Sequence, residues 1–321
     1  MELKKGQTVG FFSLREEIGN GGFGSIWKVK STEDDKYYAM KIEPLQAKRA
    51  TLAFEIGVLK RLANSERFPK YVFDGSDETK RFLVEELLGP NLFKITEHLP
   101  GQYFEDCYIA KLADEMLYCI EAVHKHGYVH RDIKPQNFVV RLNGNVAICL
   151  LDFGISKLYL NQNGQHIEAR GHPSGGGSPV YASVNSHNQV DLSRRDDLIS
   201  LIYSILSISK YRLPWMSTQG IQEIGNIKKQ HKLSVLCKPL GPGFVEFANH
   251  VESLGFADEP NYQLLHRALA KNIVKNQYLY QWQGIKVQNA QPGGNNDPTG
   301  FLLSLMPYMT EAEPESKCNI Q

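Results

Sequence analysis

Two short runs of polar and charged residues lie close together near the middle of the chain: HRDIKPQN at 130–137 and LLDFG at 150–154. Within them, Asp132 is a carboxylate that can accept a proton from a hydroxyl group. Asn137 and Asp152 offer oxygen atoms, which are the ligands that Mg²⁺ prefers. Lys134 can neutralise negative charge that develops nearby. Each residue alone could be an ordinary loop residue, but coincidence does not explain their order and intervals together.

The hexapeptide GNGGFG at 19–24 has the spacing G-x-G-x-x-G and lies between two strand-like segments. Backbone N–H groups can approach phosphate oxygens at glycine because no Cβ blocks them. A strand follows instead of a helix, which disfavours the dinucleotide-binding form of the motif. Ile26 then supplies the apolar residue of the pattern G-x-G-x-x-G-x-V. Taken alone, this segment could equally be an ordinary glycine-rich hairpin turn.

Lys41 lies within YYAMKIE at 37–43, an apolar strand pattern in which a charged residue is costly unless it is paired. Glu55 is the candidate partner, because it lies one turn after Leu52 in a helical pattern over 47–62. Such a pair would position the lysine to hold nucleotide phosphates. Considered separately, each side chain could instead face solvent.

The hydrophobic pattern divides the chain into a strand-rich part and a helical part. Strand patterns separated by turn signals occur at 11–18, 25–30, 37–43, 71–75 and 81–87. From about residue 90 the apolar spacing becomes helical, at 105–126, 196–209, 244–253 and 262–271. We therefore expect an α+β fold with a small β-rich lobe, a larger helical lobe and a ligand site in the cleft between them.

Charge and cysteine content exclude several classes of protein. The 36 basic and 35 acidic residues nearly cancel, so we expect no nucleic-acid partner. The five cysteines form no CxxC pair and support neither a zinc site nor a disulfide framework.

The first residues, MELKKGQTVGFF, do not resemble a secretory signal. The apolar run LISLIYSILSI at 198–208 is too short to span a bilayer. We expect the protein to be a monomer that is located in the cytoplasm and is able to enter the nucleus.

Several further segments carry patterns that are specific to one family: ELLGPNL at 86–92, YASVN at 181–185, RRDDL at 194–198, LPW at 213–215 and EPNYQLL at 259–265. With HRDIKPQN and LLDFG, they resemble the casein kinase I superfamily of protein kinases over about Val9 to Trp282. GGFG and YASVN are slightly nearer to the tau-tubulin kinase branch. The resemblance implies a bilobal kinase domain over 9–283, with an N-lobe at about 9–88 and a C-lobe at about 89–283. A partly disordered tail would follow at 284–321.

The resemblance implies an ATP-dependent serine/threonine kinase that transfers the γ-phosphate to hydroxyl groups of protein substrates. Asp132 would be the base, Asn137 and Asp152 would hold Mg²⁺, and Asp197 would support the catalytic loop from inside the large lobe. By composition alone, Asp197 is a helix N-cap or a first-turn helix acid. The residues implied in catalysis are Lys41, Asp132, Lys134 and Asn137. Those implied in nucleotide binding are Ile18, Gly19, Asn20, Gly21, Gly22, Phe23, Gly24, Ile26, Ala39, Lys41, Glu55, Glu85, Glu86 and Leu88.

The main alternative function is a catalytically weak kinase-like scaffold. The complete set of motif residues favours an active enzyme, whereas Glu85 and the altered segment at 178–180 favour the scaffold. A third function, a small-molecule kinase of related fold, is disfavoured by the YASVN and RRDDL segments.

Two departures from the family affect the expected binding sites. Aligned with the family's hinge, Glu85 takes the gatekeeper position, where an apolar side chain, usually Met, is expected. A one-residue shift of the alignment is the alternative. In the family, the arginine of G-T-x-R helps to bind an anion or a phosphate that is already present on the substrate. Val180 replaces this arginine, which predicts a weaker preference for pre-phosphorylated substrates. Lys228 and Lys229 either retain part of that anion site or are ordinary solvated lysines.

A third departure is the glycine-rich segment HPSGGGSP at 172–179. Such a segment loses more entropy on ordering, so we expect the activation segment to be mobile without substrate. Ser174 and Ser178 are candidate phosphorylation sites that would face Arg131.

The chain ends in Cys318-Asn319-Ile320-Gln321, which places a cysteine where a farnesylation box has one. Asn319 is not aliphatic and no polybasic run precedes it, which favours an ordinary exposed tail. We therefore expect membrane attachment only if Cys318 is prenylated.

Overall fold

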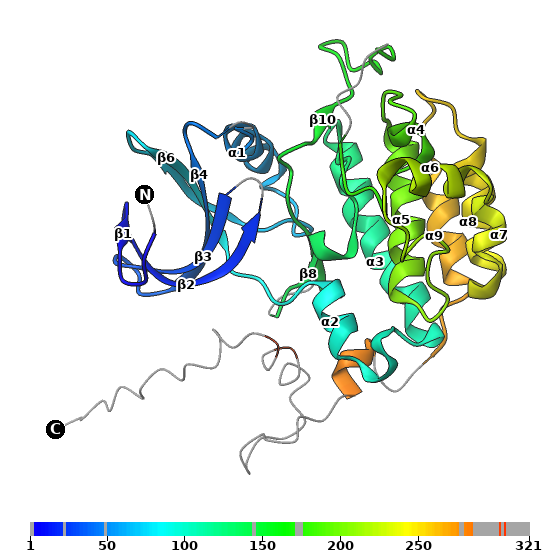
Figure 1. Cartoon of the computed structure of the whole chain (residues 1–321), viewed down its shortest axis with the longest axis horizontal. Helices are drawn as coiled ribbons and strands as arrows, with labels where there is room; N and C mark the ends of the chain where they lie inside the picture. The colour runs from blue at the N-terminus through cyan, green and yellow to red at the C-terminus, as the bar shows by residue number, and fades with distance from the viewer. Residues whose placement is uncertain are drawn as a thin grey trace.

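The computed structural model of the chain describes residues 3–21, 24–47, 50–142, 146–170, 176–275 and 279–284, together with 302 and 305. The predictions made for Gly22, Phe23, Ser174 and Cys318, and for most of the tail, lie outside the described residues. The described chain forms a small part built on a β-sheet and a larger helical part (Figure 1). The α+β fold class predicted from the sequence is confirmed.

The N-terminal part is a six-stranded antiparallel sheet with the strand order β1-β2-β3-β4-β6-β5. Its strands are β1 (Thr8–Val9), β2 (Phe12–Gly21), β3 (Gly24–Ser31), β4 (Tyr37–Pro44), β5 (Tyr71–Ser76) and β6 (Lys80–Glu86). Side chains alternate along a strand, so Met40 and Ile42 of β4 enter an apolar cluster with Trp27 on one face. Ala39 and Lys41 consequently point to the opposite face.

Helix α1 (Leu52–Leu62) packs against β5 and β6 and buries Leu52, Ile56 and Leu59. The sequence predicted this helix over 47–62, and the observed helix begins later. Glu43, itself buried, explains the difference. Its carboxylate accepts hydrogen bonds from the backbone N–H groups of Thr51 (2.8 Å) and Leu52 (3.2 Å). First-turn N–H groups have no acceptor within a helix, so Glu43 stabilises the start at this point.

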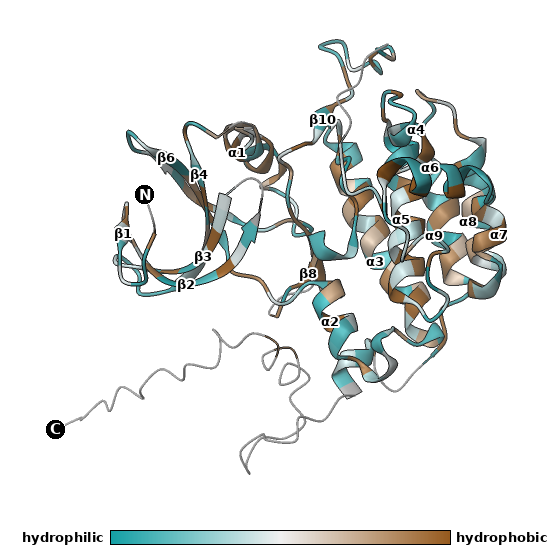
Figure 2. Ribbon diagram, in the orientation of Figure 1, coloured by the Kyte–Doolittle hydropathy of each residue, from teal (hydrophilic) through white to brown (hydrophobic). Residues whose placement is uncertain are grey.

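The C-terminal part is helical around one continuous apolar core. Its longest helices are α3 (Asp106–Lys125) and α5 (Arg194–Ile208), and Figure 2 shows apolar residues along both. The run LISLIYSILSI lies in α5, where most of its side chains are buried. The predicted helices at 105–126, 196–209, 244–253 and 262–271 are all present within about two residues of their expected ends. None of the described helices is long and apolar enough to cross a membrane.

The other elements of this part are shorter, and of these only α8 and α9 were predicted. The helices are α2 (Leu92–His98), α4 (Val184–His187), α6 (Ile221–Lys229), α7 (Leu233–Leu236), α8 (Pro242–Ser253) and α9 (Tyr262–Ala270). The strands are β7 (Tyr128–Val129), β8 (Phe138–Val140), β9 (Ile148–Leu150) and β10 (Lys157–Leu158).

The hairpin of β8 and β9 brings the runs HRDIKPQN and LLDFG together. The strands pair antiparallel, with Phe138 opposite Leu150 and Val140 opposite Ile148. HRDIKPQN ends where β8 begins, and the Asp-Phe-Gly of LLDFG begins two residues after the end of β9. The register therefore brings Asn137 and Asp152 to the same end of one hairpin.

Candidate active site

A cleft of about 800 Å³ is lined by residues from both parts of the chain. That volume is typical of a small-molecule site, which spans about 300–1,000 Å³. The predicted nucleotide-binding residues that line it are Ile18, Gly19, Asn20, Gly24, Ile26, Ala39, Lys41, Glu55, Glu85, Glu86 and Leu88. Of the other three, Gly21 ends β2, and Gly22 and Phe23 lie outside the described residues. Lys134, Asn137 and Asp152 line the same cleft from the helical part.

The hairpin of β2 and β3 covers the cleft, and Gly24 fixes its position. Gly24 has a φ of 132°, and a Cβ at this residue would lie 2.0 Å from the carbonyl oxygen of Ile42. Only glycine fits here, because any other side chain would push the hairpin away from β4. Close packing against β4 is thus a reason for this glycine that the phosphate-binding pattern did not predict.

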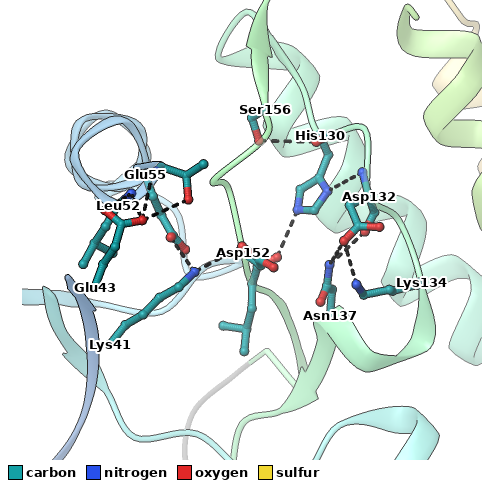
Figure 3. A network of polar contacts seen from close by, with 12 residues as sticks. Lys41, Glu43, Leu52, Glu55, His130, Asp132, Lys134, Asn137, Asp152 and Ser156 are labelled. Atoms are coloured by element: carbon teal, nitrogen blue, oxygen red, sulfur yellow. Dashed lines mark hydrogen bonds and ion pairs between the residues drawn. The ribbon is translucent and has the colours of Figure 1, made fainter. Parts of the chain in front are cut away.

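Lys41, which lines the cleft, lies between two carboxylates (Figure 3). Its Nζ is 2.6 Å from Glu55 Oε2 and 3.2 Å from Asp152 Oδ1. Burial opposes the charged ammonium, but the two carboxylates outweigh burial and raise the pKa of Lys41. Burial also opposes the Asp152 carboxylate, and Lys41 nevertheless holds its pKa below the ordinary value. The lysine therefore stays cationic and fixed, and the solvent-facing alternatives for Lys41 and Glu55 do not apply.

Asp132 is held on both carboxylate oxygens. Lys134 Nζ lies 2.6 Å from Oδ2, a contact that Figure 3 marks with a dashed line. Ser178 donates to Oδ1 from its backbone N–H (2.9 Å) and its hydroxyl (3.1 Å). Lys134 Nζ also donates to Ser178 Oγ at 3.2 Å. Asn137 Nδ2 donates to the backbone carbonyl of Asp132 at 2.8 Å. These contacts fix the orientation of a carboxylate that is only partly accessible.

Asp197, near the start of α5, holds the backbone of the loop that carries Asp132. Its two carboxylate oxygens accept hydrogen bonds from the backbone N–H groups of His130 (2.7 Å) and Arg131 (2.8 Å). His124 Nε2 lies 2.8 Å from the same carboxylate. Burial alone would raise the pKa of Asp197, but these hydrogen bonds lower it. Arg131 has a φ of 70°, an unfavourable conformation for a residue with a Cβ, which the bonds to Asp197 help to hold.

Comparisons with known proteins agree with this geometry. The family model described as a protein kinase domain matches residues 12–275. The chain is 38% identical over 285 residues to a probable casein kinase I homolog of Encephalitozoon cuniculi, covering 86% of this chain and 88% of that protein. The chain belongs to the protein kinase family, in its casein kinase I group.

A second relative is a probable serine/threonine-protein kinase of Dictyostelium discoideum, 34% identical over 263 residues. The match covers 81% of this chain but 53% of the relative, so the chain spans about half the length of that protein. The predicted membership of the casein kinase I superfamily is confirmed.

The register of β6 places Glu85 in the cleft between the two parts of this kinase. Glu85 pairs with Ala39 of β4 and lines the cleft, whereas the carboxylate of Glu86 turns away and binds Arg141 Nη2 at 2.7 Å. Val84, on the other side of Glu85, is buried in the apolar cluster of the sheet. The alternative of a one-residue alignment shift is therefore excluded. Glu86, which was also predicted to bind nucleotide, lines the cleft as well, and its carboxylate anchors the hinge to the C-terminal part.

Lys228 of α6 was expected either to retain part of an anion site or to be a solvated lysine, and both expectations were wrong. It is only 1% exposed, and its Nζ donates to the carbonyl oxygens of Pro179 (2.6 Å) and Ala182 (2.5 Å). It is neither a solvated lysine nor open to an anion from a substrate. Burial lowers the pKa of Lys228 to about 7. Lys229, the next residue, is exposed.

A second groove, of about 460 Å³, adjoins Asp132 and is lined by Lys134, Pro179, Ala182, His187 and Ile221 among others. Its wall is formed by the segment at 177–182 that Lys228 holds in place. Gly177 shapes the entrance: its φ is 86°, and a Cβ would lie 2.5 Å from the backbone oxygen of Arg131. A protein substrate has room here beside the carboxylate of Asp132.

Sequence reasoning missed the position of Ser178. It was predicted to be a phosphorylation site facing Arg131, but its hydroxyl is bonded to Asp132 and Lys134 instead. The guanidinium of Arg131 points elsewhere, because its Nε donates to the backbone oxygen of Ile155 at 2.6 Å. The signal that could have indicated this contact was that Ser178 takes the place of the threonine of the family's G-T-x-R.

Proposed function

We propose that the chain is an ATP-dependent serine/threonine protein kinase that phosphorylates hydroxyl groups of protein substrates, with Asp132 as the base. The observation that carries this proposal is the cluster of Lys41, Glu55 and Asp152 at one end of the cleft with Asp132 and Lys134 close by. A fixed cation and a fixed carboxylate suit the transfer of a phosphoryl group to a hydroxyl. The names of the relatives support the choice of serine and threonine.

The cleft fits ATP in shape and in polarity. Apolar side chains line a slot for a flat base, among them Ile18, Ile26, Ala39 and Leu151. Among the described residues, the backbone N–H and C=O of Leu88 have no hydrogen-bond partner, so they can pair with the edge of a base. Lys41, at the polar end, supplies the positive charge that phosphates require.

The residues that would hold Mg²⁺ also fit their role. Asn137 uses its amide nitrogen for the backbone of Asp132, which leaves its amide oxygen for a cation. Asp152 uses Oδ1 for Lys41 and keeps Oδ2. Both are hard oxygen donors at the end of one hairpin, the ligand type that Mg²⁺ prefers. When bound, Mg²⁺ would neutralise charge on the phosphates.

Asp132 then has a defined task. An incoming serine or threonine hydroxyl donates to its carboxylate, which accepts the proton as the hydroxyl oxygen bonds to the γ-phosphorus. The bond from that phosphorus to the bridging oxygen of ATP breaks, and ADP leaves with its electron pair. Ser178 and Lys134 keep the carboxylate in one rotamer, and the ammonium of Lys134 also stabilises negative charge on the transferring group. Removing the proton acceptor should leave binding of nucleotide intact.

The test is transfer of radiolabelled phosphate from ATP with Mg²⁺ to casein. We expect Asp132→Asn to lower the turnover by at least ~10²-fold, the smaller contribution typical of a positioned base. Asp35→Asn is the matched control, because Asp35 is an exposed aspartate in the turn between β3 and β4. Thermal shift with ATP would show that the Asp132 variant is folded and binds nucleotide. Equal turnover of Asp132→Asn and wild type would refute the assigned role, and a wild type without transfer would favour the scaffold.

A further inference from the structure

Two successive glutamates of β6 have opposite surroundings. Glu86 is bonded to Arg141 through both carboxylate oxygens, at 3.1 and 2.7 Å, and its Oε2 also accepts from the backbone N–H of Lys70 at 3.1 Å. Glu85 faces the cleft on the same side of the sheet as Ala39, its partner in the ladder. Its carboxyl group makes no hydrogen bond or ion pair with any residue that the structure describes. A polar side chain that lines a ligand cleft without a partner is available to the ligand.

Glu85 lies where the apolar slot of the cleft meets the charged cluster around Lys41. The charges near it come from three other elements: Lys41 of β4, Glu55 of α1 and Asp152 after β9, with Glu86 beside it on β6. Lys41 is already paired with the other two carboxylates, at 2.6 and 3.2 Å. Burial first, and then the charge of Glu55, raise the pKa of Glu85 to about 8, although Lys41 opposes this. At neutral pH the group is therefore mostly a neutral carboxylic acid.

A neutral carboxylic acid can both donate and accept a hydrogen bond, whereas a carboxylate only accepts. If the base of the nucleotide pairs with the backbone of Leu88, its 6-substituent lies on the β6 side of the slot. An amino group there, as in adenine, donates to the carbonyl oxygen of the acid. A keto oxygen there, as in hypoxanthine or guanine, accepts from its O–H. An apolar side chain at residue 85 would serve neither and would leave the keto oxygen without a partner.

We propose that Glu85 reads the 6-substituent of the purine and lets the cleft bind 6-oxopurine nucleoside triphosphates as well as ATP. This inference rests on the proposed nucleotide site and adds a specificity-determining residue to it. It depends on the position of the carboxyl group and on the absence of another partner for it among the described residues.

The test is the dissociation constant of the full chain for ATP and for inosine triphosphate, measured by calorimetry at pH 7. These two ligands differ in the base at position 6 and in the proton on the neighbouring ring nitrogen. The variants are Glu85→Gln, which keeps a donor and an acceptor in nearly the same shape, and Glu85→Met, which has neither. Glu78→Gln is the matched control, because Glu78 is an exposed glutamate at the turn of the same β5–β6 hairpin.

We expect wild type and Glu85→Gln to bind inosine triphosphate within about tenfold of ATP. Glu85→Met should weaken the binding of ATP less than the binding of inosine triphosphate, so that its relative affinity for inosine triphosphate falls about tenfold, because the buried keto oxygen loses its donor. An unchanged ratio in Glu85→Met would overturn the role of Glu85 while leaving the proposed kinase function intact. A folded wild type that binds neither nucleotide would overturn both proposals.

Discussion

Lys228 is a buried lysine without a carboxylate partner among the described residues, and its titration should be visible in the stability of the protein. Its ammonium nitrogen contacts the carbonyl oxygens of Pro179 and Ala182 and lies 5.0 Å and 5.2 Å from the ring centroids of Tyr203 and Trp215. The nearest other titratable group is His187, whose Nε2 is 3.2 Å away. Burial, and then the charge of Lys228, lower the pKa of His187, which favours the neutral imidazole ring beside Lys228.

The sign of the effect follows from the pKa of Lys228, which falls from 10.5 to about 7 on folding. Between these two values the unfolded chain binds more protons than the folded chain, so stability must rise with pH. Each pH unit is worth about 1.4 kcal/mol when the difference is one full proton. Because the folded group is half protonated at pH 7, the gain from pH 7 to pH 9 is about 2 kcal/mol. The neutral amine can still donate to both carbonyl oxygens.

The assay is urea unfolding at pH 7 and pH 9 for wild type, Lys228→Met and Lys229→Met. We expect the free energy of unfolding of wild type, relative to Lys228→Met, to increase by about 2 kcal/mol between the two pH values. Lys229→Met should follow wild type, because Lys229 is the exposed neighbour on the same helix. A difference between wild type and Lys228→Met that does not change with pH would refute the reasoning, since it would mean that Lys228 stays charged in the folded protein.

Two further predictions concern the groups that hold the catalytic loop. Ser178→Ala removes the hydroxyl that contacts Asp132 and Lys134. In steady-state kinetics, kcat should therefore fall by about tenfold with an unchanged KM for ATP, and Ser178→Thr should restore kcat. An equal kcat for Ser178→Ala and wild type would show that the contact does not contribute to turnover. Asp197→Ala leaves the buried N–H of His130 and the partly buried N–H of Arg131 without acceptors. Each unsatisfied group costs up to about 1–3 kcal/mol of stability. A loss below about 1 kcal/mol in urea unfolding would contradict this.

Much of the fold and of the central site could be predicted because the signals are local. The strands follow from alternating apolar residues, and the motif residues occur at fixed intervals along the chain. Lys41 and Glu55 could be paired in advance because a charged residue in an apolar strand requires a partner. The sequence patterns did not reveal Glu43 as the acceptor for the first turn of α1, since that contact depends on how the strand and the helix pack.

The errors arose where a residue acts through packing between distant segments. Lys228 was expected on the surface because α6 was not predicted, and without that helix its buried face could not be identified. The spacing of Ile224 and Lys228, four residues apart, was the signal, because residues at that interval share one face of a helix. Ser178 reaches Asp132 only because Gly177 adopts a positive φ against the backbone of Arg131.

The most direct test of the central claim is phosphate transfer to three peptides that differ only in a single acceptor, which is serine, threonine or tyrosine. The proposed function predicts transfer from ATP to the serine and threonine peptides, little or none to the tyrosine peptide, and loss of all transfer in Asp132→Asn. Transfer that persists in Asp132→Asn, or that occurs only on tyrosine, would contradict the account of this site.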